Sequence, residues 1–109
     1  MPFNTIKSQF NPTNSNKDDV GKPRVDLIEP DFILGLGEVL AFGAEKYSDA
    51  GWKDIENKHD REYASAMRHL LKWRKGEQKD EESGKNHLLH AAYNLMVLYY
   101  DDLQKEKNQ

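Results

Sequence analysis

The sequence GEVLAFGAEKYSDAGW, residues 37–52, spans the end of an apolar helix and the start of a polar loop, and the other predicted helices are arranged around it. Successive residues turn by about 100° around a helix, so Glu38 and Glu45 should lie on nearly one line, about 10 Å apart along the axis. Burying two unpaired carboxylates on an otherwise apolar helix would be costly. The pair therefore predicts a nearby metal, base or water.

The helix that contains this stretch should begin at Pro30 and run to about Lys46. Proline suits a first helical turn, and Asp31 complements the positive end of the helix dipole. Apolar side chains occupy most of its circumference, which predicts burial on several sides. Its glycines lower helix propensity, and we expect them to let another helix or a ligand approach the backbone closely.

A second helix is predicted from about Asp60 to Lys75, with Asp60 as the N-cap and Gly76 as the C-terminal stop. Its residues Tyr63, Ala66, Met67, Leu70 and Arg74 share one face. The adjacent pair Arg68 and His69 admits two interpretations, an ordinary histidine at the edge of the core or a functional pair that faces the two acids.

The loop before this helix, residues 48–60, carries two conspicuous side chains. Trp52 stands on a polar connector, where a tryptophan either covers the core or stacks on a ligand. His59 has polar neighbours on both sides, which predicts a surface position.

A third helix, from about Asn86 to Lys105, is apolar in nearly every direction except at His87, His90 and Asn94. Their spacing places all three within about 60° of arc. Three polar residues on one stripe predict a polar channel through the core, and a structural hydrogen-bond network is the alternative. The acidic loop that precedes the helix, residues 77–86, could turn one carboxylate inward.

Composition bounds the class of protein. The chain has 109 residues, 37% of them hydrophobic and 32% charged, with a net charge of −3 and no cysteine. These values suit one domain and exclude disulfides and thiolate metal sites. The acidic balance argues against a general nucleic-acid binder. Neither a membrane-spanning run nor the layout of a secretion signal is present, so we expect a cytoplasmic protein without membrane contact.

The fold class that follows is all-α: a short bundle of about three core helices. Residues 1–20, rich in polar side chains, should form a flexible N-terminal arm, and residues 21–30 an extended lead-in anchored by Val25, Leu27 and Ile28. The helical domain would span residues 21–105. Three short helices cannot cover such apolar surfaces alone, so we expect a homodimer or homotetramer.

Standard nucleotide-binding and hydrolase motifs are missing from the sequence. It has no GxxxxGK[ST] or GxGxxG loop, no HExxH and no nucleophile elbow. Phosphoryl chemistry would therefore have to rest on metals and basic side chains. Mg²⁺ is the natural partner, because it takes one or two carboxylates, waters and substrate phosphates.

Four blocks of sequence, taken together, carry a resemblance: GKPRVDLIEP (21–30), FGAEKY (42–47) followed by Trp52, RHLLKWRKG (68–76) and DEESGKNHLLHAAYN (80–94). They resemble the dATP/dGTP diphosphohydrolase family of phages and prophages, which is related to the MazG-like all-α nucleoside triphosphate pyrophosphohydrolases. The resemblance covers about Gly21 to Tyr100. It implies Mg²⁺- or Mn²⁺-dependent hydrolysis of a purine (d)NTP to monophosphate and pyrophosphate, at subunit interfaces of an oligomer in the host cytoplasm.

Under this interpretation each candidate residue has a role. The expected catalytic residues are Glu38, Glu45, His69 and His87. The expected metal ligands are Glu38, Glu45, Asp80 and Glu82. The expected nucleotide contacts are Arg24, Lys46, Tyr47, Trp52, Arg68, Trp73, His90 and Asn94.

Two other interpretations stay open. A binding protein could use the same basic and aromatic residues to sequester a nucleotide without cleaving it and without a metal. A structural or regulatory helical module could use the polar stripe only to fix its oligomer register.

Overall fold

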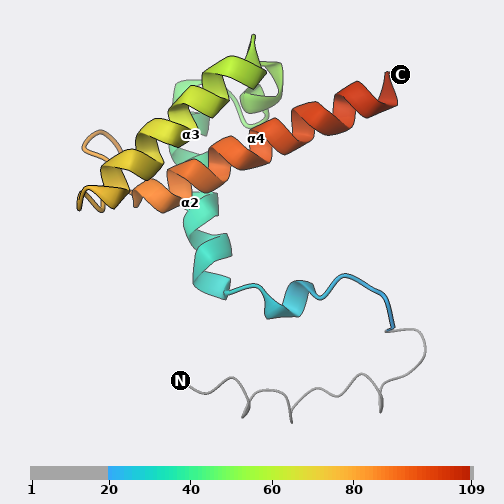
Figure 1. The fold of residues 1–109 in the computed structure, drawn as a ribbon, viewed down its shortest axis with the longest axis horizontal. Helices are drawn as coiled ribbons and strands as arrows, with labels where there is room; N and C mark the ends of the chain where they lie inside the picture. Colours follow the sequence, from blue (N-terminus) through green and yellow to red (C-terminus); the bar gives the residue numbers. More distant parts are fainter. Residues whose placement is uncertain (1–19, 109) are drawn as a thin grey trace.

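The computed structural model describes residues 20–108. The arm predicted for residues 1–20 therefore lies, except for Val20, outside the described residues. The described part is all-helical, in the order η3 (Val25–Leu27), α2 (Pro30–Lys46), η4 (Gly51–Asp54), α3 (Lys58–Arg74) and α4 (His87–Lys107), and residues 20–108 contain no strand (Figure 1). The all-α prediction with three core helices is confirmed.

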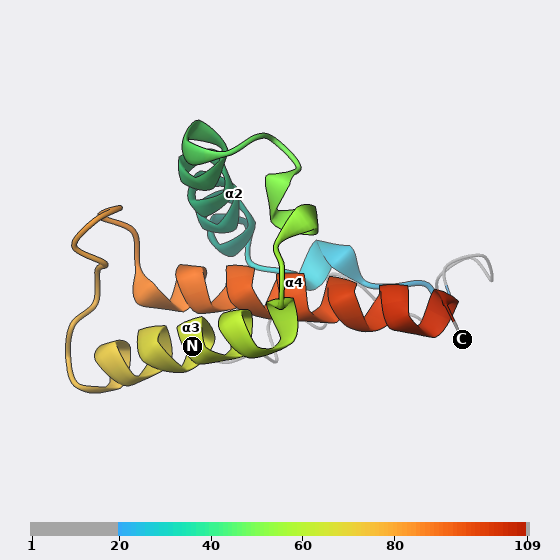
Figure 2. The same cartoon turned by 90° about the horizontal axis from the view of Figure 1, so that it is seen from above.

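Helices α3 and α4 form an antiparallel hairpin, and α2 crosses it (Figure 2). The crossing is close at Gly35, where an added Cβ would lie 2.6 Å from Cδ1 of Leu89 on α4. One glycine of α2 thus allows the close approach that the sequence predicted, whereas Gly37 and Gly43 face open space.

Local signals placed the helix ends well. The first helix begins and ends where predicted. Gly76, at φ 107°, ends α3: its amide donates to the carbonyl of Trp73 at 2.9 Å, and the next amide, that of Glu77, donates to Lys72 at 3.0 Å. This is the Schellman arrangement of a glycine stop. At the start of α4 the side chain of Asn86 accepts from the amide of Leu88 at 2.8 Å.

Other features differ from the prediction, among them the end of α4, which lies at Lys107 instead of about Lys105. Helix α3 begins at Lys58, two residues earlier than predicted, after Asn57 in a left-handed conformation (φ 53°). Asp60 is therefore a first-turn residue rather than the N-cap, where its carboxylate still complements the helix dipole. The lead-in is not simply extended, because η3 interrupts it.

The core of the single chain is small and partly polar. Within residues 20–108 the buried apolar side chains are Val39, Ala66, Ala91 and Val97, and the buried polar ones are Glu62, His87 and Asn94. His87 and Asn94 of the predicted polar stripe on α4 are thus buried, and both form side-chain hydrogen bonds, His87 with His69 and Asn94 with Glu62.

Several apolar side chains stay exposed in the single chain, whose three helices were predicted not to cover all of their apolar surface alone. Helix α2 buries only Gly35 and Val39. Three apolar residues of its first turns, Phe32, Ile33 and Leu34, are exposed. The predicted anchors of the lead-in, Val25, Leu27 and Ile28, are exposed as well, contrary to that prediction. On α3 the side that is buried carries Glu62 and Ala66 rather than the bulkier Tyr63, Met67 and Leu70. Periodicity identifies a face of a helix but not the neighbour that covers it.

Among the helices of residues 20–108, none combines the length and the hydropathy that crossing a membrane requires.

Candidate functional site

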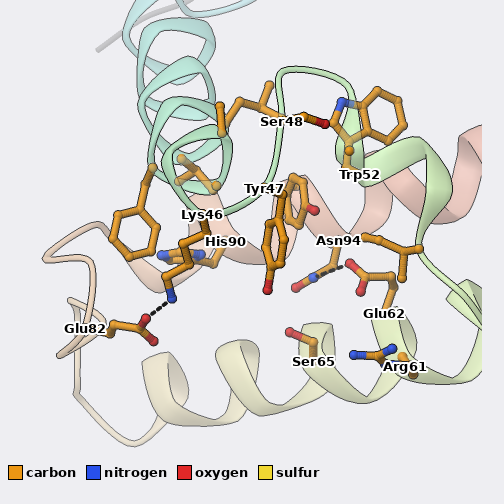
Figure 3. A pocket seen from close by; sticks show the side chains of 18 of the residues that line it. Lys46, Tyr47, Ser48, Trp52, Arg61, Glu62, Ser65, Glu82, His90 and Asn94 are labelled. Carbon is orange, nitrogen blue, oxygen red and sulfur yellow. Dashed lines mark hydrogen bonds and ion pairs between the residues drawn. The ribbon is translucent and has the colours of Figure 1, made fainter.

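A cavity of about 540 Å³ opens between the C-terminal end of α2, the η4 segment and the α3–α4 hairpin (Figure 3). This volume falls in the range of small-molecule sites, about 300–1,000 Å³. The cavity is open to solvent, and it mixes aromatic, charged and amide side chains.

One wall of the cavity holds a buried carboxylate and a buried amide. Glu62 of α3 is 8% exposed and Asn94 of α4 is 3% exposed. Asn94 Nδ2 donates to Glu62 Oε1 at 3.0 Å. Asn94 Oδ1 is buried and has no hydrogen-bond partner among residues 20–108. An unsatisfied buried acceptor costs about 1–3 kcal/mol, so this oxygen is ready to accept a ligand's donor or a cation.

The rim of the cavity carries cations and aromatic rings. Lys46 at the end of α2 forms an ion pair with Glu82 of the 77–86 loop, across the mouth of the cavity (Figure 3). Trp52 of η4 packs edge-on against Tyr100, with the ring centroids 5.1 Å apart. Its side chain thus both covers α4 and lines the cavity, so the two sequence interpretations of Trp52 are compatible. Tyr47 stands exposed at the rim.

A phenol supplies a further donor to the lining. Burial raises the pKa of Tyr93 to about 12, helped by the nearby carboxylate of Glu62. The hydroxyl therefore stays protonated at neutral pH and can donate a hydrogen bond.

The charge of the lining is unusual for a site that would hold an anion. Five acidic side chains line the cavity (Asp49, Asp54, Glu62, Asp80 and Glu82), against two basic ones (Lys46 and Arg61). A bare triphosphate would be repelled, since like charges at short range raise the energy of both groups.

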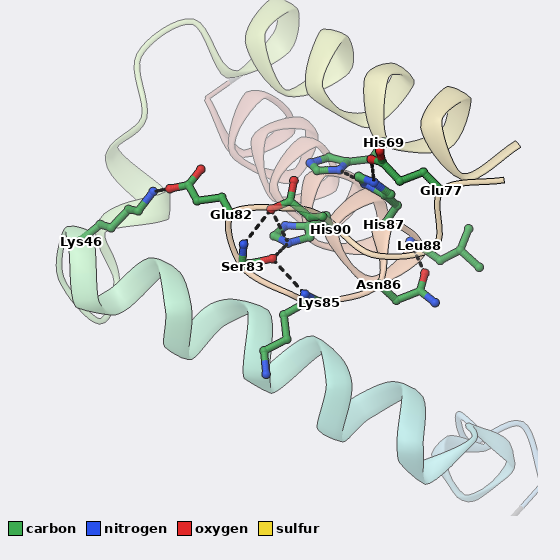
Figure 4. A network of polar contacts seen from close by, with 11 residues as sticks. Lys46, His69, Glu77, Glu82, Ser83, Lys85, Asn86, His87, Leu88 and His90 are labelled. Atoms are coloured by element: carbon green, nitrogen blue, oxygen red, sulfur yellow. Dashed lines mark hydrogen bonds and ion pairs between the residues drawn. The ribbon is translucent and has the colours of Figure 1, made fainter. Parts of the chain in front are cut away.

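Three imidazoles lie close together (Figure 4), and two of them, His69 and His90, also line the cavity. His87 is fully buried, and its Nε2 is 2.6 Å from Glu77 Oε2. Its Nδ1 is 2.8 Å from Nδ1 of His69 on α3. The ring of His69 stacks on that of His90, with centroids 4.6 Å apart and planes 9° apart. We call His69, His87 and His90 the histidine cluster.

The 77–86 loop folds over this cluster. Asp80 Oδ2 accepts from the amide of Ser83 at 2.9 Å, and the backbone of Asp80 bonds to Lys85 and Gly84 at 2.8 Å. Ser83 Oγ is 2.6 Å from His90 Nε2. Asp80 thus turns inward, as the sequence left open, while Glu81 and Glu82 stay exposed.

The surroundings of His69, His90 and Asp80 shift their pKa values. Burial, together with the neighbouring His90 and His87, lowers the pKa of His69 to about 4. Burial also lowers the pKa of His90, against the opposing charge of Asp80. Burial alone would raise the pKa of the Asp80 carboxyl group. The hydrogen bonds from Ser83 outweigh burial, so the pKa is lowered. At neutral pH His69 and His90 are therefore neutral imidazoles beside the ionised carboxylate of Asp80.

The structure brings most of the predicted site residues together. The cavity lining includes Lys46, Tyr47, Trp52, His69, Asp80, Glu82, His90 and Asn94. His87 lies beneath the lining, in contact with His69. His59 is on the surface as predicted, 72% exposed and paired with Asp60.

Five predicted residues lie elsewhere, since none of them is in the lining of this cavity. Arg24 forms a two-bond ion pair with Asp26, both bonds 2.9 Å long. Glu38 pairs with Lys85 at 2.8 Å, and Glu45 is exposed on α2. The remaining two, Arg68 and Trp73, are exposed on α3. Glu38 and Glu45 do share a face of α2, but in the single chain that face does not point into the cavity.

Sequence reasoning missed three residues of this site, Arg61, Glu62 and Glu77. Glu62 follows several charged residues at the start of α3, where charged side chains usually face solvent. The spacing of Glu62, Ala66 and His69 places them on one face of the helix, with a small residue between two polar ones. That pattern, read against the polar stripe on α4, could have identified Glu62.

Comparisons with known proteins agree with the resemblance seen in the sequence blocks. A family model described as "dATP/dGTP diphosphohydrolase, N-terminal" matches residues 12–109. The dATP/dGTP diphosphohydrolase of Salmonella phage PMBT28 is 37% identical over 84 residues, which cover 77% of this chain and 28% of that relative. The chain thus spans less than a third of the length of the curated relative it matches. No solved structure matches.

Proposed function

Because the chain belongs to the dATP/dGTP diphosphohydrolase N-terminal family, we propose that it hydrolyses purine deoxynucleoside triphosphates to the monophosphate and pyrophosphate. The relative is named for dATP and dGTP, and the cavity between α2, α3 and α4 is large enough for a nucleotide. The observation that carries the proposal is the buried Glu62–Asn94 pair, which presents a carboxylate and an unsatisfied amide oxygen to this cavity.

The acidic lining supports metal dependence. A triphosphate can enter a cavity with five acidic and two basic side chains only if cations accompany it. Mg²⁺ or Mn²⁺ fits the donors present, because the Glu62 carboxylate and Asn94 Oδ1 are hard oxygen ligands, and the phosphates complete such a site. When bound, the ion would polarise the phosphate oxygens and offset their charge. Glu82 and Asp80 are further carboxylates within the lining.

The chain's own side chains would then position the reactants. Lys46 and Arg61 contact the phosphates as cations at the rim, and the Tyr93 hydroxyl donates to an oxygen of the chain of phosphates. Tyr47 or Trp52 stacks on the base. The Glu62 carboxylate accepts a hydrogen bond from the attacking water and orients it. The water attacks the α-phosphorus, and the bond between this phosphorus and the oxygen that bridges to the β-phosphorus breaks. The β- and γ-phosphates leave with that oxygen as pyrophosphate.

We propose that the working form is a homodimer or homotetramer. Exposed apolar side chains on α2, Phe32, Ile33 and Leu34, support it, because contiguous exposed apolar surface is typical of protein interfaces.

The test is incubation of the purified chain with each (d)NTP and Mg²⁺ or Mn²⁺, with products separated by ion-exchange chromatography. We expect dAMP or dGMP and pyrophosphate. A nucleoside diphosphate with orthophosphate would contradict the proposed bond cleavage. Tight binding in EDTA, with the nucleotide recovered intact even after metal is restored, would instead support sequestration.

A further inference from the structure

We propose that His69, His87 and Asp80 form a binding site for a transition-metal ion of the Zn²⁺ or Co²⁺ type, separate from the Glu62–Asn94 pair. One ligand atom from each of the three residues lies within 4.8 Å of the other two. The two imidazoles come from facing positions on α3 and α4, and the carboxylate comes from the loop that joins these helices (Figure 4).

The two imidazole nitrogens are spaced for one shared ion. The Nδ1 atoms of His69 and His87 are 2.8 Å apart. Two metal–nitrogen bonds of about 2.1 Å at the tetrahedral angle would separate their nitrogens by about 3.4 Å, about 0.6 Å more than here. A small outward shift of the His69 ring, which is half-buried, is enough to admit the ion.

A second contact fixes the coordinating nitrogen of His87. Glu77 Oε2 lies 2.6 Å from Nε2 of His87, so the carboxylate accepts a hydrogen bond from the Nε2–H group. With the proton held on Nε2, the Nδ1 atom of His87 presents its lone pair to His69. A carboxylate behind a histidine is the usual outer partner of a metal-bound imidazole. Without metal, His69 Nδ1 donates its proton to that lone pair; with metal, the His69 proton sits on Nε2, so no proton need be released.

The 77–86 loop holds the third ligand in place. The Ser83 amide donates to Asp80 Oδ2 at 2.9 Å. Ser83 Oγ bonds to His90 Nε2 at 2.6 Å, and the His90 ring stacks on that of His69. The loop therefore fixes the carboxylate and, through His90, supports the ring of His69.

The donor set selects the class of metal. Two imidazole nitrogens and one carboxylate oxygen suit Zn²⁺, Co²⁺, Fe²⁺ or Ni²⁺, whereas Mg²⁺ prefers an all-oxygen environment. Three protein ligands leave open positions that water or a phosphate oxygen can take. His69 and Asp80 line the nucleotide cavity, so those positions can face it.

The experiment measures metal binding directly and contains no nucleotide, so its outcome is independent of the proposed hydrolysis. The untagged chain is stripped with EDTA and dialysed, then titrated with Zn²⁺, Co²⁺ or Mg²⁺ by calorimetry, and with Co²⁺ by visible absorption. We expect one Zn²⁺ or Co²⁺ per chain, bound more than about 100-fold more tightly than Mg²⁺. The cobalt form should show visible bands of a nitrogen-containing site.

Matched variants locate the ion. His69→Gln and Asp80→Asn should each weaken Co²⁺ binding by at least about tenfold, and Glu77→Gln by about 10- to 100-fold through the orientation of His87. His59→Gln removes an exposed histidine outside the cluster and should bind as the parent does. His87 is fully buried, and replacing it could unfold the chain, so the test relies on His69→Gln and Asp80→Asn, with circular dichroism to confirm their fold.

Two results would overturn the proposal. One is Zn²⁺ and Co²⁺ binding no tighter than Mg²⁺ binding in the parent chain. The other is unchanged Co²⁺ affinity in folded His69→Gln and Asp80→Asn. Either would show that the cluster is a hydrogen-bond network without a metal role.

Discussion

Replacing Glu62 by glutamine tests the proposed site with little change in shape. Glu62 is 8% exposed and accepts from Asn94 Nδ2 at 3.0 Å. The glutamine side chain would keep an oxygen acceptor at the same reach, so the bond persists but loses its charge. Bonds to charged groups contribute about 1.5–3 kcal/mol and neutral ones about 0.5–1.5, a difference of about 1 kcal/mol. Relief of the buried charge offsets part of this loss.

The expected outcome is a Tm within about 8 °C of the parent chain but a large loss of turnover. Losing a positioned carboxylate that orients water typically costs about 100-fold or more in kcat. The assay is pyrophosphate release from dGTP with Mg²⁺ at saturating nucleotide, and melting followed by circular dichroism. Glu45→Gln is the matched control, because it makes the same chemical change on an exposed side chain outside the cavity. Full activity in Glu62→Gln, or an equal loss in Glu45→Gln, would refute the assignment of the cavity as the site.

The remaining predictions concern binding, assembly and stability. Trp52→Ala should raise KM for the nucleotide about tenfold, since stacking on a base is worth about 1–3 kcal/mol, while Trp73→Ala, outside the cavity, should leave KM unchanged. Leu34→Lys, on the exposed apolar part of α2, should lower the mass measured by light scattering without loss of helix; an unchanged oligomer would place the interface elsewhere. Gly76→Ala should destabilise the fold by about 1 kcal/mol, because the backbone there has φ 107°, which alanine adopts only with strain. The added Cβ would meet nothing within 4 Å, so no steric clash adds to this cost. Thermal unfolding measures this loss, and an unchanged Tm would contradict it.

The parts of the fold that local chemistry determines were predictable from the sequence. Pro30 and Gly76 mark a helix start and a helix stop because one lacks an amide proton and the other accepts a left-handed backbone. The polar stripe His87, His90 and Asn94 was predictable because helical spacing alone decides that the three share a face. These features do not depend on which surface packs against which.

The missed parts depend on tertiary contacts. Spacing places Glu38 and Glu45 on one face of α2, but the position of the 77–86 loop decides that Glu38 meets Lys85. Glu62 stands among charged residues near the start of α3, and it is buried because α4 brings Asn94 against it. Which helix covers a face is a long-range choice, and periodicity carries no information about it.

The 77–86 loop contacts both α2, which forms one wall of the cavity, and the histidine cluster. Its exposed ion pairs, Lys46–Glu82 and Lys85–Glu38, join it to α2, and its Asp80 turns toward the imidazoles. Exposed pairs contribute at most about 1 kcal/mol each, so they position α2 weakly. The firmer contact is the close approach at Gly35 and Leu89, away from the cavity mouth. The wall formed by the end of α2 is therefore held less tightly than the α3–α4 walls that carry Glu62, Asn94 and the cluster. A nucleotide whose phosphates displace Glu82 from Lys46 would bind by exchanging a weak pair for a stronger one, without disturbing the buried residues.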